Sequence, residues 1–149
     1  MSLEITVRVL RPTDLEAVVA IDEKITGNSR PEYYRHKLDV ANLHDAQINA
    51  SLVAEAEGRV VGFLIGTLFF GEFGIPETSA LVDSLGVDLG YQDRGVGAAL
   101  FDQFRSNMKA AQVDRIYTLV EWKDFGLLKF FGNMGFLPSR RLSLECPVR

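Results

Sequence analysis

The segment from Gly86 to Gly97, GVDLGYQDRGVG, joins a run with strand character to a run with helical spacing through several glycines. Upstream, residues 79–87 read SALVDSLGV, which is typical of a strand. Downstream, apolar residues recur at the spacing of a helix: Val96, Leu100, Phe104, Met108 and Ala111. A strand that turns through glycines into a helix exposes the helix's first backbone N–H groups and its positive end. This order predicts a loop that holds an anion, with a diphosphate as the natural ligand.

Other phosphate-binding loops require different spacings. The Walker pattern Gly-x-x-x-x-Gly-Lys-Ser/Thr occurs nowhere in the chain. The dinucleotide fingerprint requires a small third residue for helix packing, and Leu100 stands at that position. One structural alternative stays open, namely that Gly90 and Gly95 only mark a turn between strand and helix.

Length and composition indicate one domain over residues 1–149, with 47% hydrophobic residues to form a core. The longest apolar run, Val60 to Phe70, is shorter than a membrane span and contains two glycines, and the N-terminus lacks a secretory pattern. We therefore expect no membrane partner. The net charge of −4 argues against nucleic acid as a partner, because phosphate neutralisation requires a basic face.

The single cysteine, Cys146, cannot form an internal disulfide, so a cytoplasmic location is expected. We expect Cys146 to be a half-buried strand residue. The two histidines, His36 and His44, lack partners at metal-ligand spacing and are expected at the surface. No metal site is predicted.

The pattern of apolar residues, turns and helix caps predicts an α+β domain with the order β-α-α-β-β-β-α-β-α-β. The first half of the chain is predicted to contain a strand over 4–10 and two helices, which begin at the capping boxes Thr13-x-x-Glu16 and Ser29-x-x-Glu32. Strands over 51–56 and 60–70 follow, joined as a hairpin through 57–59. The second half is predicted to contain the strand over 79–87, the helix after the glycine loop, a strand over 115–122, a helix over 125–134 and a strand over 140–148.

The loop Gln92-x-x-Gly95-x-Gly97 resembles the acetyl-CoA pyrophosphate loop of the GNAT superfamily of N-acetyltransferases. The order of predicted elements also matches the GNAT fold, a mixed central sheet flanked by helices, so the resemblance covers essentially the whole chain. In its overall sequence, the chain most resembles protein N-terminal or lysine acetyltransferases of the ribosomal-protein type.

Members of that family commonly carry Asn-x-x-Ala-x-x-Leu-Tyr-x-x-x-Gly-Phe after the fifth strand. Here Gly135 and Phe136 set the register of this pattern. Counting back, the positions of the asparagine, alanine, leucine and tyrosine are taken by Asp124, Leu127, Phe130 and Phe131. The spacing matches the family pattern, but the side chains at these four positions differ from those of the pattern.

The resemblance implies acetyl-CoA as the co-substrate. Main-chain N–H groups of the loop would hold its pyrophosphate, with Arg94 adding charge; the residues concerned are Gln92, Asp93, Arg94, Gly95, Val96 and Gly97. The backbone of Leu85, Gly86 and Val87 would meet the pantetheine amides and the developing oxyanion. The later pattern adds Asp124, Leu127 and Phe131 to the cofactor side.

An amine near pKa ~10 must lose a proton before it attacks a thioester. Glu121 is the first candidate for the base and Asp83 the second. The leaving thiolate is usually protonated by the tyrosine whose place Phe131 takes. Tyr117 is the candidate substitute, with Tyr33 and Tyr34 as others, and water can protonate a thiolate whose pKa is about 8.5.

The leading functional hypothesis is an acetyl-CoA-dependent N-acetyltransferase acting by direct attack on a primary amine, either a protein N-terminus or lysine or a small amine. The alternative is a non-catalytic acyl-CoA binding or sensing module, motivated by Phe131 and Asp124. A third hypothesis is a structural domain with no affinity for CoA. Pairing of edge strands into a homodimer is compatible with such a sheet.

Overall fold

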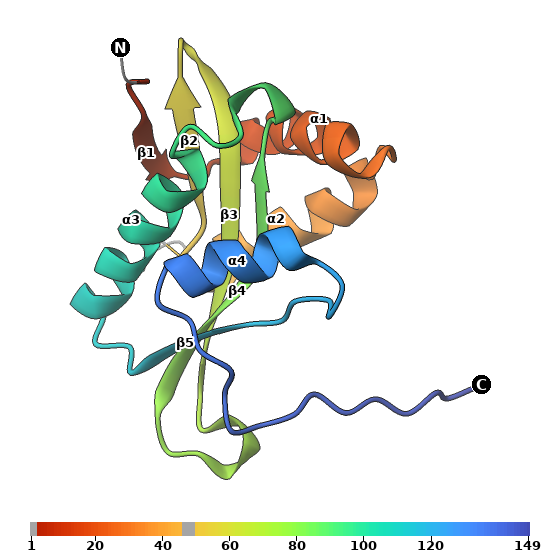
Figure 1. Ribbon diagram of the computed structural model, residues 1–149, viewed down its shortest axis with the longest axis vertical. Helices are drawn as coiled ribbons and strands as arrows, with labels where there is room; N and C mark the ends of the chain where they lie inside the picture. The colour runs from red at the N-terminus through yellow and green to blue at the C-terminus, as the bar shows by residue number, and fades with distance from the viewer. Residues whose placement is uncertain (1–2, 46–49) are drawn as a thin grey trace. The chain divides into compact units, whose positions relative to one another are not determined.

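A five-stranded sheet with the order β1-β2-β3-β4-β5 organises the first of two units in the computed structural model, residues 1–119 (Figure 1). Its neighbouring strands pair antiparallel except β4 and β5, which pair in parallel because α3 connects them. The strands are β1 (Thr6–Val9), β2 (Leu52–Ala56), β3 (Arg59–Phe70), β4 (Thr78–Val87) and β5 (Arg115–Thr118).

The structure describes residues 3–45 and 50–149, and statements about side chains leave out residues 40–45. Residues 120–149 form the second unit. The expectation of one domain over 1–149 stays a prediction. In the described ranges, none of the helices is both long and apolar enough to cross a bilayer.

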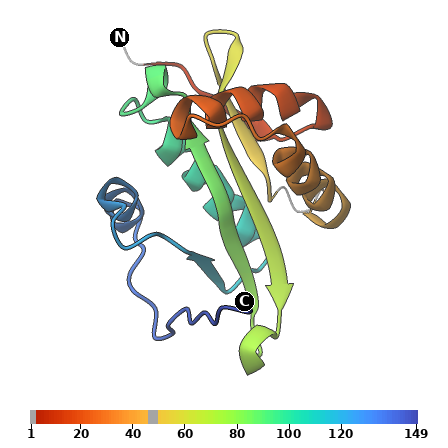
Figure 2. The same cartoon turned by 90° about the vertical axis from the view of Figure 1, so that its right-hand side faces the viewer.

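Helices cover both faces of the sheet in the first unit. Figures 1 and 2 show α1 (Leu15–Thr26) and α2 (Pro31–Asp45) on one face and α3 (Val96–Ala110) on the other. The α1–α2 face encloses a buried cluster made up of Leu10, Val18, Ile21, Tyr34, Leu38, Val53, Phe63 and Ile65. On the opposite face, α3 buries residues at helical spacing: Val96, Leu100, Phe101, Phe104 and Met108. The predicted helical pattern after the glycine loop is confirmed.

Two glycines of β3 let α3 approach the sheet closely. A Cβ atom at Gly66 would lie 2.5 Å from Cε1 of Phe104 and 2.6 Å from the carbonyl oxygen of Ala50. A Cβ atom at Gly62 would lie 2.9 Å from Cγ1 of Val96. A side chain at either position therefore collides with α3 or with backbone.

The turn between β2 and β3 confirms the predicted hairpin. Glu57 and Gly58 are its two central residues, with φ angles of 53° and 79°. Positive φ at both positions is the geometry of a type I′ turn, whose twist matches that of paired antiparallel strands.

The first helix begins differently from the predicted capping box at Thr13. A 3-10 turn, Pro12–Asp14, precedes α1, and the Asp14 carboxylate accepts the backbone N–H of Arg11 at 2.7 Å. The same carboxylate forms an ion pair with Arg8 at 2.8 Å. Asp14 is therefore the N-cap residue of α1, but its carboxylate binds Arg11 and Arg8 rather than the first N–H groups of the helix.

A buried polar network ties α1 to α2. The Asp22 carboxylate accepts Nη2 of Arg30 at 2.7 Å and the hydroxyl of Tyr34 at 2.9 Å. The hydrogen bond from Arg30 holds the pKa of Asp22 below its usual value, against the opposing effect of burial. Burial and the bond to Asp22 raise the pKa of Tyr34.

The second unit contains α4 (Phe125–Asn133) and then a segment without helix or strand. The predicted strand over 140–148 is wrong, and β5 ends at Thr118 rather than at 122. Cys146 is exposed and not a half-buried strand residue.

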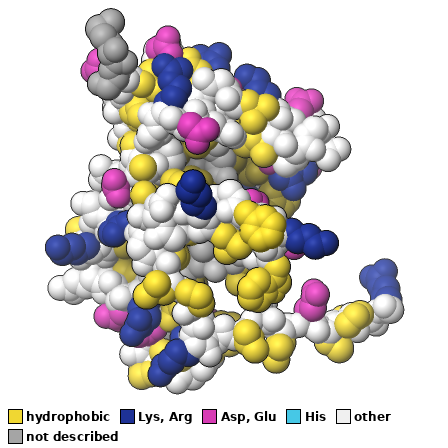
Figure 3. Space-filling view, in the orientation of Figure 1, with side chains coloured by type: hydrophobic (Ala, Val, Ile, Leu, Met, Phe, Trp, Pro, Cys, Tyr) yellow, Lys and Arg dark blue, Asp and Glu magenta, His cyan; other side chains and the backbone are white. Residues whose placement is uncertain are grey.

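Leu142, Leu144 and Val148 alternate as in a strand but are 82%, 88% and 97% exposed, and Figure 3 shows apolar side chains along this segment. Alternation alone does not form a strand, because the backbone groups also need a partner strand.

We predict that Gly66→Ala lowers the free energy of unfolding by about 1–3 kcal/mol, because the new methyl group meets a carbonyl oxygen that cannot rotate away. Urea denaturation measures the change. The matched control is Gly132→Ala on α4, where a Cβ atom meets nothing within 4 Å. Alanine there should raise helix stability by about 0.5–1 kcal/mol. Equal stability of Gly66→Ala and the wild type would contradict the described packing of α3.

We predict that Asp22→Asn lowers stability at pH 7 by about 1–3 kcal/mol, because Arg30 loses its ionic partner. A carboxylate whose pKa is depressed on folding stabilises the protein above its unfolded pKa of about 3.9, and this contribution is lost as pH falls through the folded pKa. Acid titration of stability should therefore be less steep for the variant below about pH 4. Glu32→Gln, which removes only an exposed ion pair with Arg35 on α2, is the control. Identical acid profiles for Asp22→Asn and the wild type would refute this linkage.

Candidate functional site

One edge of β4 is paired over only part of its length. β5 pairs with residues 79–82 of β4 and ends there, and the hydroxyl of Thr118 donates to the carbonyl oxygen of Val82 at 2.9 Å. From Asp83 to Val87, no strand of the described residues pairs with β4 on this side, although β3 pairs with residues 84–87 on the other. This stretch has free backbone donors and acceptors that a ligand with amide groups can use.

A β-bulge marks the point where the pairing with β5 stops. Ile65 lies opposite Ser84 and Gly66 lies opposite Val82, so Asp83 is an extra residue on β4. The Asp83 carboxylate forms an ion pair with Nζ of Lys37 on α2 at 2.8 Å. The hydrogen bond to Asp83 raises the pKa of Lys37, against the opposing effect of burial. Nζ of Lys37 also lies 5.6 Å from the ring centre of Tyr33.

The loop after β4 presents a row of free donors. A 3-10 turn, Leu89–Tyr91, is followed by Asp93 and Gly95 with φ angles of 59° and 88°, and α3 then begins at Val96. The backbone N–H groups of residues 92–98 have no hydrogen-bond acceptor among the described residues. These groups include the first turn of a 15-residue helix, whose dipole is positive at this end. The arrangement can bind a multiply charged anion.

Asp88 lies between β4 and this loop and is only 5% exposed. Its carboxylate accepts the backbone N–H of Gly90 at 3.0 Å, Nζ of Lys24 at 2.9 Å and Nη2 of Arg59 at 3.1 Å. Burial alone would raise the pKa of Asp88, but the hydrogen bonds from Lys24 and Gly90 and the charges of Lys24 and Arg59 lower it overall.

Two guanidinium groups lie over the ring of Tyr91 beside the loop. The Cζ atom of Arg59 is 5.2 Å from the ring centre, and that of Arg94 is 5.1 Å away. The side chains of Lys24 and Arg59 are about half exposed, at 50% and 53%. Lys24, Arg59 and Arg94 thus bring three positive charges to the loop, against the carboxylates of buried Asp88 and of Asp93 in the loop itself. This excess positive charge favours an anionic ligand.

The tyrosines proposed as acids have different environments. The hydroxyl of Tyr117 donates to Oε1 of Glu77 at 3.1 Å, and its backbone pairs with Leu81 on the part of β4 before the bulge. The Tyr34 hydroxyl donates to buried Asp22, whereas Tyr33 is 42% exposed. Within the first unit, Tyr33 is thus the more accessible of the two on α2.

The remaining predicted site residues belong to the second unit. Asp124 is the N-cap of α4, where its carboxylate accepts the backbone N–H of Leu127 at 3.1 Å. The ring of Phe131 packs edge to face against Phe136, with ring centres 4.9 Å apart. The backbone carbonyl of Glu121 accepts the N–H of Asp124 at 3.0 Å, in the turn before α4. The roles of these residues in the site stay predictions.

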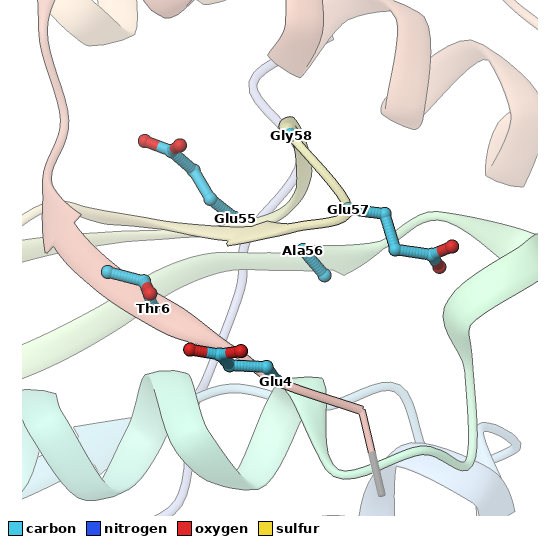
Figure 4. Close-up of a pocket in the computed structure, with 6 residues that line it drawn as sticks. All are labelled: Glu4, Thr6, Glu55, Ala56, Glu57 and Gly58. Carbon is cyan, nitrogen blue, oxygen red and sulfur yellow. The ribbon is translucent and has the colours of Figure 1, made fainter. Parts of the chain in front are cut away.

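A cavity of about 330 Å³ lies at β1 and the β2–β3 turn. Figure 4 shows Glu4, Glu55 and Glu57 around it, with carboxylates that point in different directions. Across the described part of the chain, no group of three or more His, Cys, Asp or Glu side chains can hold a metal ion.

Sequence reasoning missed Asp88 and its two cationic partners. Lys24 and Arg59 are 64 and 29 residues from Asp88 in sequence, so no local pattern joins them. A weaker signal was present, because an Asp two residues before a glycine is typical of an Asx turn.

Comparisons with known proteins identify a family and a fold. A model of the acetyltransferase (GNAT) family matches residues 15–136 of the chain. No curated protein matches the sequence.

Among solved structures, the chain is similar to the aminoglycoside N-acetyltransferase AAC(6')-Iy in complex with CoA, with a TM-score of 0.81, 13% identity, and coverage of 100% of this chain and 98% of that one. It is also similar to a ribosomal-protein-alanine N-acetyltransferase from Brucella melitensis biovar Abortus 2308, with a TM-score of 0.76, 16% identity, and coverage of 98% and 100%. A third similar structure is Ard1 from Thermoplasma volcanium, with a TM-score of 0.76, 21% identity, and coverage of 91% and 84%. At such identities the likeness shows the fold, and it confirms the predicted α+β architecture.

Proposed function

The chain belongs to the acetyltransferase (GNAT) family, and from that premise we propose that it transfers the acetyl group of acetyl-CoA to a primary amine. Acetyl-CoA is the usual acyl donor of this family, and one similar structure was determined with CoA. The family assignment does not specify the acceptor, so the primary amine is the new part of this proposal.

The observation that carries the proposal is the row of unpaired N–H groups over residues 92–98, which follows the unpaired edge of β4 after residues 88–91. A diphosphate on the loop and an amide-bearing arm along Leu85, Gly86 and Val87 would use both sets of groups at once. Acetyl-CoA has these two parts in this order. In this proposal Gln92, Asp93, Arg94, Gly95, Val96 and Gly97 hold the diphosphate.

Direct attack by the amine requires a base and a stabilised oxyanion. Backbone N–H groups of residues 85–87 would meet the oxyanion, because a fixed dipole aimed at developing charge lowers the barrier. We assign the base to Glu121. Asp83 ranks second because Lys37 already occupies its carboxylate.

The leaving thiolate needs a proton, which the Phe131 ring cannot supply. The Tyr117 hydroxyl already donates to Glu77, so we favour water as the proton source over Tyr117. A thiolate with a pKa of about 8.5 leaves without full protonation. Asp124, Leu127 and Phe131 are then proposed to line the cofactor rather than to act on protons.

The acceptor is either a protein N-terminus or lysine, or a small amine. The similar structures include proteins named for ribosomal-protein alanine and for aminoglycosides, so acceptors of both kinds occur on this fold. The net charge of −4 suits a cationic acceptor of either kind. A cytoplasmic location and edge-strand dimerisation stay predictions.

A non-catalytic acyl-CoA binding module is the alternative function. It is favoured by Phe131 and Asp124, which stand where the family usually has tyrosine and asparagine. Such a module binds acetyl-CoA without releasing a thiol, so binding and turnover must be measured separately.

We predict that acetyl-CoA binds the wild type with micromolar affinity in calorimetry and that Gly97→Glu abolishes binding, because a carboxylate in the first turn of α3 repels the diphosphate. The matched control is Ser106→Glu, which adds the same charge to an exposed position on the same helix. This control should bind as the wild type does. Absence of binding by the wild type would refute both the enzyme and the binding module.

We predict that Glu121→Gln lowers kcat for amine acetylation by about 10²- to 10⁴-fold, because the acceptor loses its base. Release of the CoA thiol measures turnover with diamines, aminoglycosides and peptides as acceptors. Calorimetry with acetyl-CoA should give an unchanged Kd. A larger loss for Asp83→Asn than for Glu121→Gln would move the base to Asp83, and binding without thiol release for any acceptor would favour the binding module.

A further inference from the structure

Asp88 connects three separate segments of the first unit at the point where the loop begins. Lys24 lies in the last turn of α1, Arg59 is the first residue of β3, and Gly90 is in the 3-10 turn. The buried Asp88 carboxylate contacts a nitrogen atom of each at 3.1 Å or less. No other residue of the described chain makes this set of contacts.

The backbone around Asp88 is fixed as firmly as its side chain. The Asp88 N–H donates to the carbonyl oxygen of Val61 at 2.8 Å, which anchors the residue to β3. The Asp88 carbonyl accepts the N–H of Tyr91 at 2.8 Å, while Oδ1 accepts the N–H of Gly90. These bonds consume the donors of residues 88, 90 and 91. The uninterrupted row of unpaired N–H groups begins directly after these residues, at Gln92.

The two oxygens of the carboxylate have different partners. Oδ1 takes the backbone N–H of Gly90, whereas Oδ2 takes both Lys24 and Arg59. Two cations on one carboxylate leave a local charge of about +1, and both side chains remain half exposed. The guanidinium of Arg59 is also placed over the Tyr91 ring, on which Arg94 lies.

A carboxylate next to an anion-binding loop repels the anion unless its charge is offset. Here Lys24 and Arg59 more than offset it, and the remaining effect of Asp88 is geometric. It determines where the loop leaves β4 and holds two cations beside the loop.

We propose that Asp88 is a positioning residue for acetyl-CoA, which acts through Gly90, Lys24 and Arg59 and does not itself contact the ligand. This inference rests on the proposed function for its effect on acetyl-CoA. Its effect on the loop is independent of that function, because the contacts form without ligand.

The test compares Asp88→Ala and Asp88→Asn with Asp102→Asn, an exposed position on α3 that loses the same charge. Two readouts are used. The first is amide hydrogen exchange at Gly90 and Tyr91 in the ligand-free protein. The second is steady-state kinetics, with KM for acetyl-CoA and kcat measured separately.

Asp88→Ala should speed exchange at Gly90 and Tyr91 and raise KM for acetyl-CoA by about 10- to 100-fold, since a displaced binding group loses that much. kcat should stay within about threefold, because the chemical step is not touched. Asp88→Asn keeps an oxygen for the Gly90 N–H, so exchange there should return toward the wild-type rate and KM should lie between the two. Asp102→Asn should change neither readout.

Unchanged exchange in Asp88→Ala, or a loss of kcat at constant KM, would overturn the inference. If Asp88→Ala fails to fold, Asp88→Asn decides, and a KM equal to that of the wild type then refutes the role of the two cations. If the wild type does not bind acetyl-CoA at all, the proposed function fails, and the exchange experiment alone decides whether Asp88 positions the loop.

Discussion

The close approach of α3 to β3 is the constraint on which the rest of the site depends. Gly62 and Gly66 have no side chains, so the α3 residues that face the sheet lie directly against the β3 backbone. Because α3 is held there, its first turn lies close to the end of β4. The loop can then be short, and the donors of residues 92–98 stay unpaired. A bulkier residue at position 62 would move the same helix turn that is proposed to hold the diphosphate.

The two faces of the sheet contribute different properties. The α3 face supplies rigid packing and the helix dipole, whereas the α1–α2 face supplies charged side chains that reach β4 and the loop. Lys37 contacts Asp83 at the bulge, and Lys24 contacts Asp88 at the loop. Both cations come from helices that the sequence places before β2, so residues far from the loop in sequence control the charge around it.

Features that depend on neighbours in sequence were predictable. The strand, glycine loop and helix over 79–110 follow from local periodicity and from the conformational freedom of glycine. The β2–β3 hairpin follows from the short glycine-bearing segment 57–59, although the turn itself uses only residues 57 and 58. Features that depend on tertiary partners were not. Asp14 at the start of α1 forms an ion pair with Arg8 on β1, and the Asp88 cluster joins segments up to 64 residues apart. The alternation over 140–148 predicted a strand, but within residues 120–149 that segment finds no partner. The roles of Glu121, Asp83 and Tyr117 in catalysis stay predictions, since side-chain type alone does not fix a proton path.

The bulge at Asp83 divides β4 into two halves that are out of phase. Residues directly opposite each other in an antiparallel pair share a face, so Val82 lies on the face of Gly66 and Gly86 lies on the face of Phe63. Even-numbered side chains therefore face α3 before the bulge and face α1 and α2 after it. A single extra residue thus uncouples the half of the strand that joins β5 from the half that borders the loop. Removing that residue would invert the second half as a block, exchanging the side chains presented to the two layers while leaving the pairing with β5 intact.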